Sequence, residues 1–157
     1  MEPFAAGIIP YIHGPQFLLG LEKSNNKWSG FVGGSETGET PIETALREFN
    51  EETCMIFKDH EAFFYSKLTT TQPVIETTPS GKIVYLWFIK CPASLFGLDF
   101  NQFYINQRLT DNRYLKEKSQ LVLFDLQEIK SYKVLYRLKQ TILKIFGFYG
   151  NPNYRNS

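Results

Sequence analysis

The sequence predicts an α/β fold in which a mixed β-sheet lies between helices. Short apolar runs typical of strands fill the first part of the chain and return in its second half. A well-marked amphipathic helix separates these two groups of strands, and a further helix follows the last strand. Elements in this order favour a layered α/β/α sandwich.

The chain length suits one domain. Its 157 residues are enough to bury a core. We expect the domain to span residues 1–150 and residues 151–157 to form a flexible C-terminal tail. No apolar run approaches the roughly 18 residues of a membrane span, and the first residues lack the basic segment of a signal peptide. Two cysteines, Cys54 and Cys91, allow at most one disulfide, and reduced thiols in the cytoplasm are the expectation.

The charge is nearly balanced but unevenly distributed. A formal net charge of +1 excludes a field that attracts nucleic acid over the whole surface. After Glu128, however, every charged residue is basic. A solvated face on the last helix explains this distribution, and attraction of a polyphosphate or RNA chain to that end is the alternative.

Turn residues mark the ends of the first predicted strands. Residues 5–11 and 16–22 are apolar runs separated by a His-Gly-Pro turn, which predicts a β-hairpin. After a polar loop, residues 28–32 (WSGFV) predict a short extended segment that leads into Gly33 and Gly34.

The central helix has a clear beginning. Thr40 and Glu43 match the T-x-x-E capping box, and Pro41 occupies the first helical position. Apolar residues then follow with the spacing of a buried helical stripe: Ile42, Ala45, Leu46 and Phe49.

Three carboxylates crowd one edge of this stripe. Glu48 and Glu52 are one turn apart and Glu51 lies beside them, so their like charges repel one another. Charge pattern alone leaves three interpretations open: a solvated acidic face in which Arg47 pairs with Glu51, a calcium site, or a magnesium site. The lack of a ligand loop argues against calcium. Glycines before the helix favour magnesium, because they allow the backbone to approach a phosphate or metal closely.

The second half of the chain is less sharply marked. Residues 61–70, 82–90 and 121–126 have the composition of strands. A turn-rich stretch separates the first two, and we expect residues 92–110 to be irregular. The spacing of apolar residues predicts a last helix over residues 131–146.

The stretch from Gly33 to Met55 resembles the Nudix box, G-x5-E-x7-R-E-U-x-E-E-x-G-U, in which U is a bulky apolar residue. One position departs from it, because Cys54 stands where the box has its second glycine. That glycine would adopt a positive φ past the helix, so a cysteine there costs about 1 kcal/mol unless the helix continues. The preceding WSGF is similar to that of family members that hydrolyse oxidised purine triphosphates.

The resemblance implies a metal site. Glu48, Glu51 and Glu52 would bind Mg²⁺, for which Mn²⁺ could substitute. Gly33 or Gly34 would offer the metal a backbone carbonyl.

The resemblance also implies roles around this site. Arg47 would hold the carboxylates in place, Glu48 would accept a proton from the attacking water, and Glu39 would be structural. Family members often add a carboxylate from outside the box. Glu117 matches that position best, and Glu76 is the second candidate.

The implied function is Mg²⁺-dependent hydrolysis of a phosphoanhydride bond in a nucleoside diphosphate-linked substrate. The box leaves the attached group open. Trp28 and Phe31 are candidates for binding the base, as are Tyr85 and Trp87, although each aromatic also suits the core. Two alternatives remain: hydrolysis of the mRNA cap on capped RNA, and a nucleotide-binding module without turnover. Many Nudix domains form homodimers, so a dimer is a further expectation.

Overall fold

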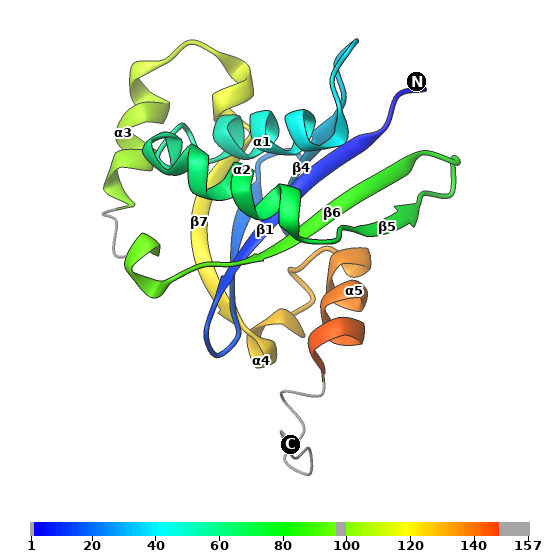
Figure 1. Cartoon of the computed structure of the whole chain (residues 1–157). Coiled ribbons are helices and arrows are strands. Elements are labelled where there is room, and N and C mark those ends of the chain that lie inside the picture. The colour runs from blue at the N-terminus through cyan, green and yellow to red at the C-terminus, as the bar shows by residue number, and fades with distance from the viewer. Residues whose placement is uncertain (1, 97–99, 148–157) are drawn as a thin grey trace.

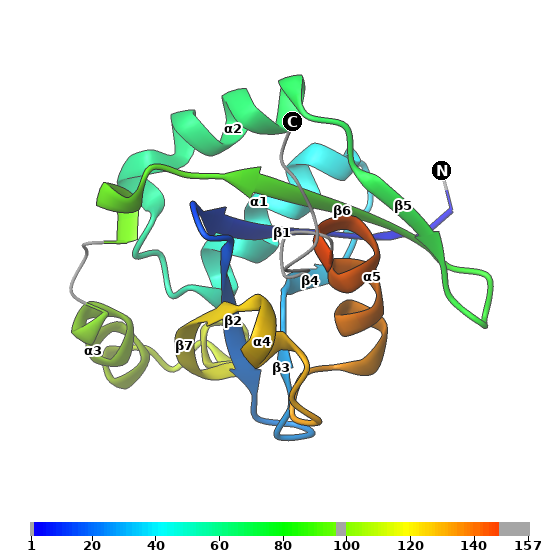
Figure 2. The same ribbon diagram turned by 90° about the horizontal axis from the view of Figure 1, so that it is seen from below.

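The computed structural model describes residues 2–96 and 100–147. Figure 1 shows a sheet with helices on both sides, and Figure 2 shows the same layers from below. The predicted α/β/α arrangement with a mixed sheet is confirmed. The expected tail, residues 151–157, lies outside the described residues. Among those described, no helix combines the length and apolar character that a membrane span requires.

The sheet is built around β1. Within the described residues it contains seven strands: β1 (Ala5–Ile12), β2 (Gln16–Glu22), β3 (Trp28–Ser29), β4 (Phe31–Gly34), β5 (Val74–Thr77), β6 (Ile83–Lys90) and β7 (Lys118–Asp125). The main path is β3-β2-β1-β6-β5, with β4 paired to β1 and β7 paired to β2. The β1–β6 pair is parallel and the other pairs are antiparallel.

Helices cover the two faces of this sheet. They are α1 (Pro41–Glu52), α2 (Glu61–Thr70), α3 (Asn101–Leu109), α4 (Leu126–Ile129) and α5 (Tyr136–Phe146), with a 3₁₀ turn, η3, at Arg113–Lys116. In Figures 1 and 2, α1 and α2 lie on one side of β1 and β6, and α4 and α5 lie on the other. Two apolar cores result, one on each face.

Strand β6 contributes side chains to both cores. Trp87 and Ile89 pack in the core under α1 and α2, whereas Leu86 and Phe88 pack in the core under α5. Successive side chains of a strand point to opposite faces, so a strand covered on both sides is apolar throughout.

Helix α1 begins where the sequence predicts. The Glu43 amide donates to Thr40 Oγ1 (3.2 Å), and the Thr40 amide donates to a Glu43 carboxylate oxygen (3.0 Å). Ala45 and Phe49 of the predicted stripe are fully buried. The ring of Phe49 packs 4.7 Å from that of Phe64 in α2, measured between centroids.

The predicted strand at residues 61–70 is wrong, because this segment forms α2. Phe64 and Leu68, one helical turn apart, are its buried residues. Both edges of β6 are already paired, with β1 and with β5, so no neighbouring position remains for another strand there. Strand β5 itself forms inside the stretch expected to be rich in turns.

Two further expectations need correction. Part of residues 92–110 forms α3 and is not irregular. The last helix starts at Tyr136, not at residue 131. Before it, the Trp28 amide donates to the Lys133 carbonyl (2.8 Å) and the Leu135 amide donates to the Trp28 carbonyl (2.9 Å). Together they form an isolated parallel bridge between Trp28 and Val134, and the helix begins only after it.

Replacing Thr40 with alanine should lower the free energy of unfolding by about 1 kcal/mol, because the helix loses a side-chain cap. This corresponds to a fall in Tm of about 3 °C for a chain of this size. Thermal unfolding followed by circular dichroism measures it. Thr37→Ala, at an exposed position in the preceding loop, is the matched control. Equal Tm values for the two variants would contradict the role of the cap.

Candidate active site

Gly33, in strand β4, lies next to Glu48, one of the carboxylates of α1. A Cβ at Gly33 would overlap the carboxylate of Glu48, so any other residue here would have to push that flexible side chain aside. The backbone at Gly33 is therefore in contact with this carboxylate. Glycine allows the Glu48 carboxylate to come this close without being displaced.

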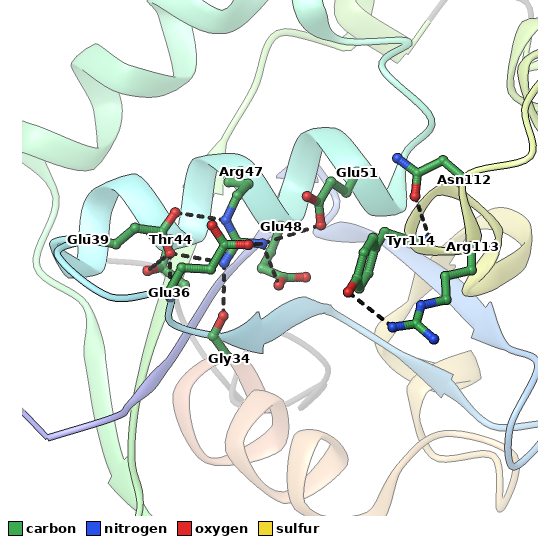
Figure 3. A network of polar contacts seen from close by, with 10 residues as sticks. All are labelled: Gly34, Glu36, Glu39, Thr44, Arg47, Glu48, Glu51, Asn112, Arg113 and Tyr114. Carbon is green, nitrogen blue, oxygen red and sulfur yellow. Dashed lines mark hydrogen bonds and ion pairs between the residues drawn. The ribbon is translucent and has the colours of Figure 1, made fainter.

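Arg47 joins the loop after β4 to α1 (Figure 3). Its guanidinium donates to four groups: Glu39 through Nε (2.7 Å), Glu48 and Glu51 through Nη1 (3.0 and 3.3 Å), and the Gly34 carbonyl through Nη2 (2.8 Å). Surrounding carboxylates raise the pKa of Arg47 further above its ordinary value.

Glu39 is fixed from several directions. It accepts hydrogen bonds from Arg47, from the Thr44 hydroxyl (2.8 Å) and from the Glu36 amide (2.8 Å). The hydrogen bond from Arg47 is the main cause that lowers the pKa of Glu39 to about 2. These contacts agree with a structural part for Glu39.

The three carboxylates of the predicted cluster are partly or fully removed from water. Glu48 is 9% exposed and Glu52 is 3% exposed, while Glu51 is half-buried. Burial raises the pKa of Glu48 to about 7 and raises that of Glu51, although Arg47 opposes both shifts. Burial also raises the pKa of Glu52 well above its ordinary value. A crowded anionic site of this kind favours a bound cation.

Lys118 is a member of the site that the sequence does not reveal. Its side chain is 2% exposed, and its Nζ lies 3.6 Å from a carboxylate oxygen of Glu52 and 3.6 Å from one of Glu22. It also donates to the Gly30 carbonyl (3.1 Å) and to the Ser29 hydroxyl. These partners come from β2, the β3–β4 region and α1, so no local pattern distinguishes Lys118 from an exposed lysine.

A cavity of about 790 Å³ opens beside Glu52. Its lining includes Glu117, which is exposed at the end of η3. The negative charge of Glu117 contributes to the raised pKa values of Glu48, Glu51 and Glu52. The other candidate, Glu76, instead accepts a hydrogen bond from Thr141 of α5.

Two of the four aromatics expected to bind the base, Phe31 and Trp28, pack in the cores. Phe31 is fully buried, and its ring centroid is 5.5 Å from that of Phe49. It therefore offers no exposed face on which a base could stack. Trp28 is half-buried, and its ring centroid lies 5.0 Å from that of Phe124, in the core under α5.

The residues suit Mg²⁺ in chemical type. Among the described residues, no three His, Cys, Asp or Glu side chains are arranged as a ready metal site. Glu48 and Glu51 face Arg47, and one oxygen of Glu52 faces Lys118. The other oxygen, Glu52 Oε2, is buried without a hydrogen-bond partner in the described part of the chain. Unpartnered buried acceptors are costly, and carboxylate and carbonyl oxygens are the ligands that Mg²⁺ prefers.

The residue that replaces the second glycine of the box keeps a positive φ. Cys54 has φ 53° and Met55 has φ 63°. The buried Cys54 thiol donates to the Leu115 carbonyl (2.8 Å), and the Asn106 amide side chain donates to the Cys54 carbonyl (2.6 Å). The end of α1 is thereby bonded to both α3 and η3.

One family model matches most of the chain. The family model described as the NUDIX domain matches residues 1–133. No curated protein sequence matches the chain significantly.

Similar solved structures cover nearly the whole chain at low identity. A C. elegans Ap4A hydrolase in a binary complex has a TM-score of 0.60 at 18% identity, covering 93% of this chain and 98% of that one. A mutT/nudix family protein from Listeria innocua has a TM-score of 0.57 at 15% identity, with coverages of 93% and 92%. A bifunctional NMN adenylyltransferase/ADP ribose pyrophosphatase from Francisella tularensis has a TM-score of 0.63 at 13% identity, with coverages of 96% and 42%.

Replacing Glu39 with glutamine should lower Tm at neutral pH, because Arg47 loses a charged partner. The folded-state pKa of Glu39 is lowered from 4.5 to about 2. Its stabilising contribution is therefore complete above about pH 4.5 and is lost as the pH falls towards 2. The Tm difference from the wild type should stay constant from pH 8 to pH 5 and narrow below that. Asp59→Asn, outside this network, is the control, and a difference unchanged at pH 3 would refute the linkage.

Replacing Lys118 with methionine should destabilise the fold by about 3–5 kcal/mol, because Glu52 loses its buried cation. Adding Glu52→Gln should recover part of that loss, since the uncompensated charge is removed. Chemical denaturation of wild type, both single variants and the double variant forms a cycle that measures this coupling. Lys90→Met, at an exposed position, is the control. Strictly additive effects would show that Lys118 and Glu52 do not interact.

Proposed function

We propose that this chain, which belongs to the Nudix hydrolase family, hydrolyses a phosphoanhydride bond in a nucleoside diphosphate-linked substrate. Mg²⁺ is the proposed cofactor and Mn²⁺ its substitute. The observation that carries the proposal is the carboxylate cluster of α1, in which Glu48 and Glu52 are buried. Arg47 holds Glu48 and Glu51, and a cavity adjoins Glu52.

The chemistry of the bond explains why such a site is suitable. A phosphoanhydride carries negative charge on its bridging and non-bridging oxygens, and it resists attack by neutral water. When bound, Mg²⁺ supplies neutralising charge and lowers the pKa of coordinated water. The donors we assign to it are Glu48, Glu51, Glu52, Glu117 and the Gly33 carbonyl.

We assign roles in the reaction to two residues, Glu48 and Arg47. Glu48 is the proposed acceptor of the proton from the attacking water, and a well-placed general base contributes roughly 10²–10⁴-fold to the rate. Its contact with the backbone of Gly33 limits the positions that its carboxylate can take. Arg47 is a positioning residue, because it holds Glu48 and Glu51 from one guanidinium nitrogen.

The names of the structural neighbours support a nucleotide substrate without selecting one. One neighbour is an Ap4A hydrolase and another includes an ADP ribose pyrophosphatase. Both names describe compounds in which a nucleoside diphosphate is joined to another group. The attached group in the substrate of this chain therefore needs a substrate panel.

The alternatives remain predictions. The basic residues of α5, which prompt the cap-hydrolysis hypothesis, lie on the face of the sheet opposite α1 (Figure 1). One of them, Arg137, donates to the Thr77 carbonyl (3.1 Å). A nucleotide-binding module without turnover, a homodimer and a cytoplasmic location also stay predictions.

The double variant Glu51→Gln/Glu52→Gln should lower kcat/KM about 100-fold or more, because it removes two anionic metal ligands. Release of phosphate or pyrophosphate from a nucleotide panel, with Mg²⁺, Mn²⁺ or a chelator, measures turnover. Mn²⁺ binding followed by electron paramagnetic resonance gives a second readout and should weaken in parallel.

Glu43→Gln is the matched control, because Glu43 is exposed on the same helix and glutamine also suits the capping box. Unchanged turnover in the double variant would rule out the metal assignment. Nucleotide binding by the wild type without any metal-dependent turnover would favour the non-catalytic module.

A further inference from the structure

Two adjoining cavities lie beside the carboxylates. The 790 Å³ cavity next to Glu52 is also lined by Lys23 and Lys116. A second cavity, of about 610 Å³, shares these two lysines and is further lined by Tyr104, Gln107 and Arg108. Each volume by itself is that of a small-molecule site. Together they offer room for a ligand longer than a single nucleotide.

The outer walls of these cavities carry cations without anionic partners. The cationic groove, as we call it, comprises Lys23, Arg108, Arg113 and Lys116. Among the described residues, none of the four lies within 4 Å of a carboxylate. Four carboxylates also line the first cavity, Glu22, Glu52, Asp111 and Glu117, whereas none lines the second. Like charges brought together in this way repel one another, and a bound polyanion would relieve the repulsion.

The groove is preformed by hydrogen bonds between distant segments. The Lys23 amide donates to the Glu117 carbonyl (3.1 Å), which joins the end of β2 to the start of β7. The Gln107 side chain donates to the Leu115 carbonyl (3.3 Å), which joins α3 to η3. Figure 1 shows the segment from α3 through η3 arching beside α1 before the chain enters β7. A wall fixed before binding reduces the entropy lost when a ligand binds.

The second cavity also contains an aromatic residue. Tyr104 lines the second cavity and is 36% exposed. Its flat ring offers a stacking surface for a nucleobase, and such stacking tolerates any base. Carboxylates therefore line the first cavity, cations line both, and the aromatic ring lines the second.

We propose that the cationic groove and Tyr104 bind the far phosphates and the second nucleoside of a dinucleoside polyphosphate. This inference rests on the proposed function, since it identifies the group attached to the nucleoside diphosphate. Hydrolysis adds one water across a P–O–P bridge. The water oxygen bonds to phosphorus, the bridging P–O bond breaks, the leaving phosphate oxygen carries away the electron pair, and one proton passes through Glu48 to solvent.

The test compares substrates that share one adenosine but differ in the far group. They are ADP-ribose, ATP, adenosine tetraphosphate and diadenosine tetraphosphate, each with Mg²⁺. The wild type should have its highest kcat/KM for diadenosine tetraphosphate. In Lys23→Ala/Arg108→Ala/Lys116→Ala, KM for this substrate should rise about 10-fold or more with little change in kcat, whereas KM for ADP-ribose should change less than about twofold.

The matched control removes equal charge elsewhere. Lys67→Ala/Lys90→Ala/Lys144→Ala takes three exposed lysines that line neither cavity of the groove, and it should leave both KM values unchanged. Tyr104→Ala should raise KM for diadenosine tetraphosphate but not for adenosine tetraphosphate, and Tyr104→Phe should restore it. Equal changes for short and long substrates would overturn the proposal.

Binding separates this proposal from the proposed function. If no substrate is hydrolysed but diadenosine tetraphosphate binds and the groove variant weakens its binding in calorimetry, the groove stands and the hydrolase assignment fails. If hydrolysis occurs without preference for the longer chain, the hydrolase stands and the groove assignment fails. Capped RNA that binds more tightly than diadenosine tetraphosphate, and is unaffected by the groove variant, would also overturn it.

Discussion

The guanidinium of Arg47 holds together groups that would repel one another without it. Glu39, Glu48 and Glu51 all direct carboxylate oxygens towards it, and its remaining nitrogen reaches the Gly34 carbonyl. Because this planar cation has donors on three nitrogens in fixed directions, a lysine could not make the same set of bonds. The position of the loop after β4 depends on this network, and so does the contact between Gly33 and Glu48.

Local signals account for the parts of the fold that could be predicted from the sequence. The capping box marks the start of α1, and the apolar stripe places Glu48 and Glu52 at the edge of the core, where both are buried. Residues 61–70 carry no comparable signal, since runs of aromatic residues suit strands and helices alike. Their helical state depends on which strands already occupy the edges of β6. The late start of α5 likewise depends on bonds to Trp28, which is remote in sequence.

The residues of the candidate site also differ in whether local sequence signals reveal them. Spacing groups Glu48, Glu51, Glu52 and Arg47 together, because they share one helix, and the resemblance to the Nudix box implies their roles. Lys118 could not be found, since its partners come from several separate segments of the chain. Phe31 shows the opposite difficulty. An aromatic residue close to a site in sequence has the same pattern whether it faces a substrate or the core, and only the packing against Phe49 distinguishes the two.

Strands β1 and β2 each pair with a strand from the second half of the chain, and this constrains how the protein folds during synthesis. Ala5 of β1 is paired with Val84, and Phe17 of β2 is paired with Phe124. The first strands to leave the ribosome must therefore wait for partners from the second half of the chain. Contacts so distant in sequence close large loops and slow folding. Until β7 emerges, the nascent hairpin has an uncovered edge that could pair with other chains. Glu52 likewise acquires the ammonium of Lys118 only when the last strand has been added.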